Sequence, residues 1–368
     1  MQHPTSLPRA FARPAPWLAA ALIGAALTLP AAVSAADPST MTKTGTRFKA
    51  DRDMQSVLDA LAAMNGKPIE TLPAAEARLQ PTPTDAVKAV LAKQGKDSSP
   101  TALVPGVSSV DRDIPGAVGP LPARIYTPAG TGPFPVVVYF HGGGWVIASK
   151  DVYDGGARGL SKTSGAIVVS VDYRLAPEAK FPAAWDDALA AYRWVAANAS
   201  TFNGNQQLAL AGESAGGNLA IATAIAARDA GAPKPLAIIA VYPVGQTGNL
   251  ATPSYVDSEK AKPLNKAMIG WFVENLLSKP EDKADPRLDL VNANLKGLPP
   301  VTIINAQIDP LRSDGELLQA ALLRAGVPVE RKVYPGATHE FFGTAAVVAK
   351  ARQAQAYAGQ RLRTAFGY

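Results

Sequence analysis

The sequence predicts an α/β fold in which helices cover both faces of a mostly parallel sheet. Short apolar runs typical of buried strands alternate with longer segments of helical spacing, and this alternation is characteristic of parallel sheets. A serine between glycines, in Gly212-Glu-Ser-Ala-Gly216, follows one such strand and precedes a helix. The chain has 368 residues, of which 47% are hydrophobic and 18% charged, enough for one large domain with an accessory piece.

Helical spacing comes first in the chain. Three helical segments are expected before the first strand, at residues 51–63, 73–79 and 84–93. Thr84 or Asp85 is the expected N-cap of the third segment, because both side chains can accept a hydrogen bond from a free backbone N–H. Residues 95–105 have the composition of a polar linker.

Strands and turns follow the linker. The expected strands are residues 107–114, 121–126, 136–140, 166–171, 207–211, 237–242, 301–305 and 329–334. The first two are joined by the short turn 115–120, so this pair is expected to be antiparallel. A helical insert at residues 248–280, with its helix at 262–277, interrupts the alternation of strand and helix.

Ser214 is the candidate nucleophile. It lies in a Gly-x-Ser-x-Gly sequence, a pattern in which a serine occupies a tight turn between a strand and a helix. The flanking glycines, Gly212 and Gly216, are required because a Cβ in so tight a turn would clash. The context fits, since residues 207–211 predict a strand and residues 218–227 an apolar helix.

A nucleophilic serine needs a base, and the chain contains only three histidines. His3 lies in a segment expected to be removed, and His141 precedes three glycines that suggest another role. His339 is therefore the candidate base.

The base in turn needs a carboxylate, which in this arrangement lies between the serine and the histidine in the chain, at the end of a strand. Asp309 follows the strand at 301–305 and is the favoured acid. Asp314 is the alternative, but it falls in the first turn of a helix expected at 315–325, where the helix dipole favours a carboxylate in any case.

The sequence His141-Gly142-Gly143-Gly144 follows the strand at 136–140. A glycine-rich loop in this place can turn its N–H groups toward a developing oxyanion, and the N–H of Ala215 would add another donor. The plainer interpretation, a flexible loop, is disfavoured by the serine and histidine found in the same chain.

Together these motifs resemble the hormone-sensitive-lipase-like esterases, the bacterial group called family IV, within the α/β-hydrolases. The matching sequences are His141-Gly-Gly-Gly144, Val171-Asp-Tyr-Arg-Leu-Ala-Pro-Glu178, Phe181-Pro-Ala-Ala-Trp-Asp-Asp187, Gly212-Glu-Ser-Ala-Gly-Gly217, Asp309-Pro-Leu-Arg312 and His339. The resemblance runs from about residue 50 to the C-terminus.

The resemblance implies a triad of Ser214, Asp309 and His339, with an oxyanion hole formed by Gly143, Gly144 and Ala215. It also implies that His141 is structural. The expected fold is an α/β-hydrolase domain at 106–368, with a mostly parallel eight-stranded sheet and a helical cap contributed by residues 36–105 and the insert at 248–280. The expected activity is hydrolysis of short- to medium-chain or aryl carboxylic esters through an acyl-enzyme, without cofactor or metal.

Other activities remain open on the same triad: a lipase, an amidase or an acyltransferase. A non-catalytic ligand-binding protein on a hydrolase scaffold is an alternative from another class. It is disfavoured because such relatives lose the base or the acid, whereas this chain has Ser214, Asp309 and His339.

The chain departs from the family pattern at a few positions. Glu213 replaces a more usual aspartate, residues 312–314 replace a more acidic run, and Glu340 follows the base where a glycine is usual. Glu340 is expected to shift the pKa of the base or to narrow the site.

Other residues in the motifs are expected to be structural. Tyr173 and Trp185 are not expected to point at the serine, and Arg174 is expected to pair with Asp186 or Asp187. The insert aromatics Trp271 and Phe272 have two interpretations: they line a substrate pocket, or they attach the cap to the body.

Residues 1–35 have the pattern of a secretory signal peptide. Arg9 and Arg13 precede an apolar run of 13 residues from Trp17 to Leu29, and Val33-Ser-Ala35 supplies small residues for cleavage. The run is short for a bilayer, so no stable membrane anchor is expected, although an uncleaved anchor is the alternative. The mature protein is expected to be periplasmic or secreted.

Charge gives no support for nucleic-acid binding. The net charge of +6 falls to +4 when residues 1–35, with two arginines and no acidic residue, are removed. We find no clustered basic stripe, zinc-type spacing or phosphate-binding loop. The expected partner is a small-molecule ester, and a homodimer is left open.

Overall fold

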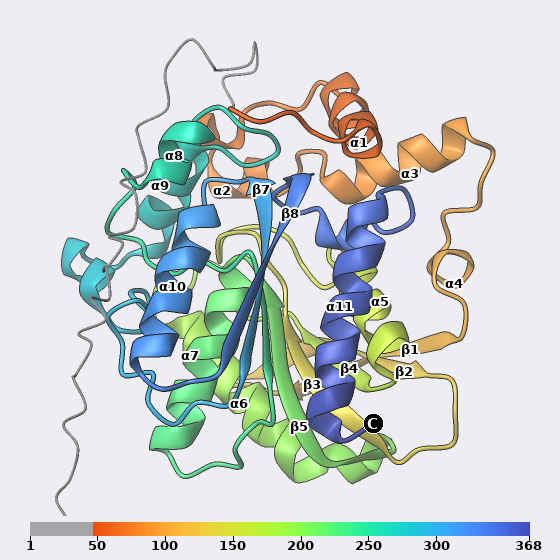
Figure 1. The fold of residues 1–368 in the computed structure, drawn as a ribbon, viewed down its shortest axis with the longest axis vertical. Coiled ribbons are helices and arrows are strands. Elements are labelled where there is room, and N and C mark those ends of the chain that lie inside the picture. Colours follow the sequence, from red (N-terminus) through yellow and green to blue (C-terminus); the bar gives the residue numbers. More distant parts are fainter. Residues whose placement is uncertain (1–46) are drawn as a thin grey trace, which may run out of the picture. The chain divides into compact units, whose positions relative to one another are not determined.

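The computed structural model describes residues 47–368 (Figure 1). The expected signal peptide, residues 1–35, lies outside these residues. Within the part described, no helix has both the length and the apolar character needed to cross a membrane.

A single eight-stranded sheet runs through the centre of the fold (Figure 1). Its strands are β1 Val107–Pro115, β2 Pro120–Pro128, β3 Phe134–Phe140, β4 Ile167–Val171, β5 Gly204–Glu213, β6 Ile238–Val241, β7 Val301–Ile308 and β8 Val329–Thr338. They lie in the order β1-β2-β4-β3-β5-β6-β7-β8. The pairs β1–β2 and β2–β4 are antiparallel, and all others are parallel. The predicted fold class and the antiparallel start are confirmed.

Helices cover both faces of the sheet. They are α1 Arg52–Ala63, α2 Ala74–Ala77, α3 Pro83–Lys93, α4 Pro100–Leu103, α5 Asp154–Ser164, α6 Ala183–Asn198, α7 Ala215–Asp229, α8 Pro253–Asp257, α9 Lys266–Leu276, α10 Arg312–Arg324 and α11 Ala349–Phe366. Short 3₁₀ helices occur at Ile69–Thr71, Ala199–Phe202, Pro280–Ala284 and Phe342–Thr344. Helices α5 and α11 lie on one face, and α6, α7 and α10 on the other (Figure 1).

Strand β3 shows why the central strands are continuously apolar. Val136, Val138 and Phe140 pack into the core on the α6–α7 side, whereas Val137 and Tyr139 pack into the core on the α5–α11 side. Every residue of β3 is buried, because both faces of a parallel sheet are covered by helices.

Three expectations for the helical segments are corrected. The N-cap of α3 is Thr82, whose hydroxyl accepts a hydrogen bond from the N–H of Asp85, while the Asp85 carboxylate accepts one from the N–H of Thr82. Pro83 begins the helix, so a cap at Thr84 or Asp85 would fall inside it. The linker contains the short helix α4, and the insert helix begins at Lys266 because Asn265 caps it.

Arg174 pairs with Asp187 and not with the neighbouring Asp186. Its Nε and Nη2 donate to the Asp187 carboxylate at 2.7 and 3.0 Å, and its backbone N–H donates at 3.1 Å. The backbone N–H of Ala117 adds another hydrogen bond at 3.2 Å. Asp187 is fully buried, whereas Asp186 is exposed. Asp187 thus fixes the loop after β4 and the β1–β2 turn to helix α6.

We predict that Asp187→Ala lowers the free energy of unfolding by about 3 kcal/mol, because a buried carboxylate that accepts hydrogen bonds from Arg174 and from two backbone N–H groups is removed. Urea denaturation monitored by tryptophan fluorescence measures this change. Asp186→Ala is the matched control, with an expected effect within about 0.5 kcal/mol. Equal losses in the two variants would contradict a specific role for Asp187.

Candidate active site

Ser214 occupies the turn between β5 and α7. Its backbone has φ +57° and ψ −118°, a conformation that L-residues rarely adopt and that costs on the order of 1–3 kcal/mol. Its N–H donates to the carbonyl of Val241 at 2.8 Å, which anchors the turn to β6. A Cβ on Gly216 would overlap the carbonyl oxygens of Phe140 and His141, so only glycine allows α7 to begin this close to β3.

His339 joins Ser214 to Asp309. Its Nε2 lies 3.0 Å from Ser214 Oγ, and its Nδ1 lies 2.8 Å from Asp309 Oδ2. The N–H of Leu311 donates to the other carboxylate oxygen of Asp309 at 2.8 Å and fixes its orientation. The three side chains come from the ends of β5, β7 and β8 and are all buried. The structure therefore brings together the three residues that the sequence singled out.

The surroundings of His339 favour its protonated form. Burial lowers the pKa of the imidazole, but the charge of Asp309 and the hydrogen bond to it outweigh burial, with smaller contributions from Glu340 and Glu213. The net result is a pKa above the ordinary value. A histidine of this kind can accept a proton from the serine once the pH lies above its pKa.

Asp314 does not contact the imidazole. It lies in the first turn of α10, where its Oδ2 accepts hydrogen bonds from the N–H groups of Gly245 at 3.1 Å and Gln246 at 3.4 Å. Burial raises the pKa of Asp314 to about 8, so the carboxyl is largely neutral at pH 7. Asp309 is therefore the acid that faces the base, and Asp314 supports the loop after β6.

The glycine loop turns two N–H groups away from the rest of the chain. Gly143 and Gly144 have φ of +96° and +60°, and within residues 47–368 their N–H groups meet no acceptor. A Cβ on Gly143 would overlap the carbonyl of Ile147, and the ring of Phe272 lies against Gly144. Ala215 is the first residue of α7, so its N–H has no partner within the helix. These three donors can face an oxyanion near Ser214.

His141 supports this loop from behind. Its Nδ1 lies 2.7 Å from the carbonyl oxygen of Gly142, and its ring stacks on that of Tyr173 at 4.3 Å. The hydroxyl of Tyr173 donates to the carbonyl of His141 at 2.8 Å. Burial lowers the pKa of His141. The contact of Tyr173 with the glycine loop was not expected from the sequence.

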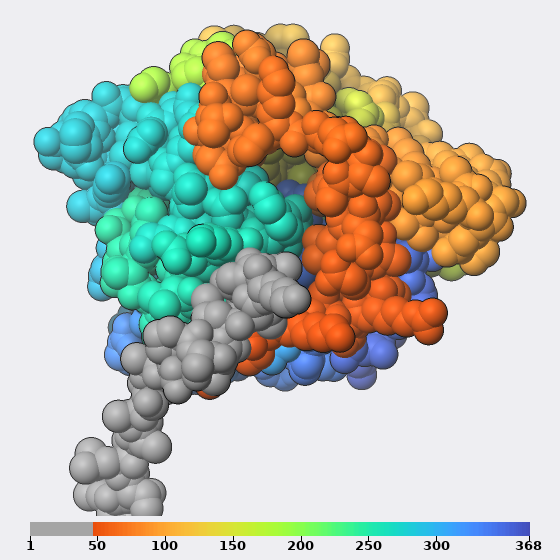
Figure 2. Space-filling model, turned by 90° about the horizontal axis from the view of Figure 1, so that it is seen from above, coloured from red at the N-terminus to blue at the C-terminus, as the bar shows by residue number. Residues whose placement is uncertain are grey.

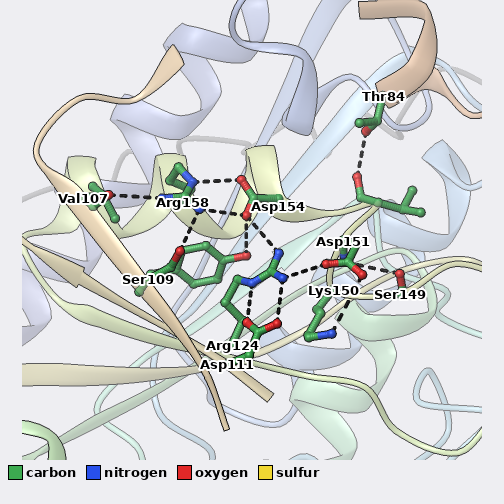
Figure 3. A network of polar contacts seen from close by, with 12 residues as sticks. Thr84, Val107, Ser109, Asp111, Arg124, Ser149, Lys150, Asp151, Asp154 and Arg158 are labelled. Carbon is green, nitrogen blue, oxygen red and sulfur yellow. Dashed lines mark hydrogen bonds and ion pairs between the residues drawn. The ribbon is translucent and has the colours of Figure 1, made fainter. Parts of the chain in front are cut away.

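A network of ion pairs holds the segment that follows the glycine loop (Figure 3). Arg124 on β2 contacts the carboxylates of Asp111 at 2.6 Å, Asp151 at 2.8 Å and Asp154 at 3.4 Å. Arg158 on α5 adds a pair with Asp154 at 2.8 Å. The segment that contains Asp151 is therefore connected by ion pairs to β1, β2 and α5.

A cavity of about 370 Å³ opens above the serine. Figure 2 shows a hollow between the orange N-terminal residues and the teal insert. Its apolar wall comes from α1, the segment 145–152 that follows the glycine loop, and residues 264–273, which include most of α9. It contains Leu58, Leu61, Trp145, Ile147, Ala148, Val152, Leu264, Met268, Ile269, Phe272 and Val273.

The two insert aromatics differ in role. Phe272 lines the cavity, whereas the indole N–H of Trp271 donates to the carbonyl of Leu72 at 3.1 Å and attaches α9 to the N-terminal segment. Both interpretations of these aromatics thus hold, one for each residue.

Two further carboxyls lie close to the base. Glu340 was expected there from the sequence, whereas the contacts of Glu213 were not. Glu213 accepts hydrogen bonds from the hydroxyls of Tyr139 and Tyr242, and burial raises its pKa to about 7. The ring of Tyr242 in turn lies 4.5 Å from that of His339. Glu340 follows the base and also lines the cavity.

Among residues 47–368, no group of three or more histidine, cysteine, aspartate or glutamate side chains is arranged to hold a metal ion.

Comparison with known proteins finds similarity to proteins of the α/β-hydrolase fold and to esterases. A family described as having the α/β-hydrolase fold matches residues 137–343. The carboxylesterase NlhH of Mycobacterium tuberculosis is 38% identical over 280 residues, which cover 74% of this chain and 88% of that protein. An arylesterase of Saccharolobus solfataricus is 34% identical over 236 residues, covering 61% of this chain and 74% of that protein.

Comparison with solved structures also finds similarity to esterases. A hyperthermophilic esterase of Pyrobaculum calidifontis superposes with a TM-score of 0.77 at 34% identity, covering 86% of this chain and 99% of the other. The similarity therefore extends over nearly the whole of that protein.

We predict that Asp309→Asn lowers kcat for p-nitrophenyl acetate about 10⁴-fold, because the amide would hold the imidazole in the wrong tautomer, as in a known protease triad. Asp314→Asn is the matched control and should leave kcat close to the wild-type value. Steady-state kinetics on both variants test this, and a greater loss in Asp314→Asn would assign the acid to Asp314.

Proposed function

We propose that this chain, a member of the α/β-hydrolase family, is a carboxylic ester hydrolase that uses Ser214 as its nucleophile. The observation that carries the proposal is the continuous contact from Ser214 Oγ through His339 to Asp309, at 3.0 and 2.8 Å. Nucleophile, base and orienting acid within hydrogen-bond reach are the requirements for acyl transfer. The similar proteins named above are a carboxylesterase, an arylesterase and an esterase, which supports the same reaction.

The proposed reaction has two halves. His339 takes the proton of Ser214 as its oxygen attacks the ester carbonyl, while Asp309 holds the imidazole and stabilises its charged form. The N–H groups of Gly143, Gly144 and Ala215 bind the developing oxyanion, each contributing roughly 2.7–4 kcal/mol to the transition state. His339 then protonates the leaving alcohol, and an acyl-enzyme remains.

Water completes the reaction by the same steps. His339 accepts a proton from water as the water oxygen attacks the acyl carbonyl. It then returns this proton to Ser214 Oγ as the bond between Oγ and the acyl carbon breaks and the carboxylic acid leaves. Because the base acts in its neutral form, the rate should rise with pH through the pKa of His339. No step needs a group beyond those in the site.

The substrate class we propose is short- to medium-chain or aryl esters. Support comes from the size of the cavity, about 370 Å³, and from its largely apolar wall. A similar protein of Pseudomonas putida is an ethyl acetate hydrolase, 34% identical over 239 residues. A lipase, an amidase or an acyltransferase would use the same triad, but no feature of the cavity favours one of them.

We also propose that the protein is exported through its N-terminal 35 residues and acts in the periplasm or outside the cell. The basic start, the apolar run from Trp17 to Leu29 and the small residues at 33–35 support this.

Activity across p-nitrophenyl esters from acetate to palmitate tests the substrate class. We expect kcat/KM to peak at about two to eight acyl carbons, because each buried methylene contributes roughly 0.8 kcal/mol until the cavity is full and overpacking begins. Rates should follow ordinary saturation. A preference for long-chain triglycerides, or a jump in rate when the substrate forms an emulsion, would identify a lipase.

A further inference from the structure

Glu340 occupies a backbone position that favours glycine. Its φ is +61°, in the left-handed region, which costs a residue with a Cβ on the order of 1 kcal/mol. A strained residue next to the base is a reason to ask what its side chain does. Glycine at this position would avoid the strain but would lack a side chain. The carboxyl is therefore what glutamate adds at this position.

One oxygen of this carboxyl is held and the other is free. Oε1 accepts a hydrogen bond from the hydroxyl of Tyr153 at 3.0 Å, and that hydroxyl lies against Gly142 of the glycine loop. Within residues 47–368, Oε2 has no hydrogen-bond partner. Glu340 is half-buried and lines the cavity, so the free oxygen is available to a group bound there.

The position of Glu340 selects the alcohol side of an ester. The leaving oxygen must receive its proton from His339 Nε2, so the alcohol portion passes next to His339. Glu340 follows His339 directly in the chain, and both residues line the cavity. A charged group in the alcohol portion would therefore pass close to Glu340.

The other charged side chains around the cavity do not neutralise the negative charge of Glu340. Arg78 is paired with Glu178 at 2.6 Å. Lys67 and Lys262 are exposed, where water screens them. The remaining carboxylate on the wall is Glu70, which accepts a hydrogen bond from Asn265 on the cap at 3.2 Å.

We propose that Glu340 forms a subsite for a positively charged group in the alcohol portion of the ester, with Tyr153 holding the carboxyl in place. This inference rests on the proposed esterase function. It makes Glu340 a specificity-determining residue, which acts on binding and leaves the proton transfers to Ser214 and His339.

The ionisable groups that face Glu340 are His339, Asp309, Glu213 and Tyr153. Burial raises the pKa of Glu340, while His339 and the hydrogen bond from Tyr153 lower it and Asp309 raises it. A cation bound in the cavity stabilises the carboxylate. The kinetic measurements are made at pH 8, because a higher pH favours the charged form of the Glu340 carboxyl.

Two acetate esters with alcohols of the same shape test the subsite: acetylcholine, which is cationic, and 3,3-dimethylbutyl acetate, which is neutral. We expect kcat/KM to be about tenfold higher for the cationic ester in the wild type, the size of effect expected for a partly hydrated charge pair. The ratio is the readout, because a change in the shared catalytic steps cancels from it.

Glu340→Gln should bring the ratio close to one, since glutamine keeps an oxygen for Tyr153 but loses the charge. Tyr153→Phe removes the hydrogen bond that holds the carboxyl in place and should lower the ratio while keeping the charge, which provides a second variant if Glu340→Gln folds poorly. Glu70→Gln is the matched control for charge elsewhere on the wall and should change the ratio less than about twofold.

The outcomes separate this inference from the proposed function. Hydrolysis of both esters at equal efficiency by wild type and Glu340→Gln would overturn the subsite and leave the esterase function intact. A ratio that falls as much in Glu70→Gln as in Glu340→Gln would also overturn it. If neither ester, nor any p-nitrophenyl ester, is hydrolysed, the proposed function itself fails.

Discussion

The close packing of the first turn of α7 against the end of β3 is the constraint on which the site depends. Gly216 allows this contact, because any side chain there would overlap the carbonyls of Phe140 and His141. The same contact brings the N–H of Ala215 and the glycine loop to the serine from two separate strands. The strained backbone of Ser214 is held by its hydrogen bond to Val241, so packing of the sheet stabilises a turn that would not persist alone.

Buried polar groups hold the loops around this contact. Tyr173 and His141 support the glycine loop, and Glu213 connects Tyr139 on β3 with Tyr242 after β6. Tyr242 then packs on the imidazole of His339. The position of the base is therefore coupled to the same strands that place the nucleophile, and the site can be regarded as one unit that is preorganised by the sheet.

The features that could be predicted from the sequence are those encoded by neighbouring residues and those that follow by elimination. The elbow at Ser214 is contiguous, and with three histidines in the chain His339 was the remaining candidate for the base. The strands were recognisable because both faces of the sheet are covered and the runs are apolar. Helix α5 was not predicted, since its glycines give it low intrinsic helix propensity and burial against α11 stabilises it. The partners of Glu213 lie 74 and 29 residues away, and no local pattern reveals such contacts.

The central claim, that Ser214 is an activated nucleophile, is tested most directly by reaction with a fluorophosphonate followed by peptide mass spectrometry. The account predicts one covalent adduct per chain, on the peptide that contains Ser214, and none in Ser214→Ala when circular dichroism shows that the variant is folded. Loss of the adduct in folded His339→Ala would show that the base activates the serine. An adduct on another residue, or an unchanged adduct in Ser214→Ala, would contradict the account.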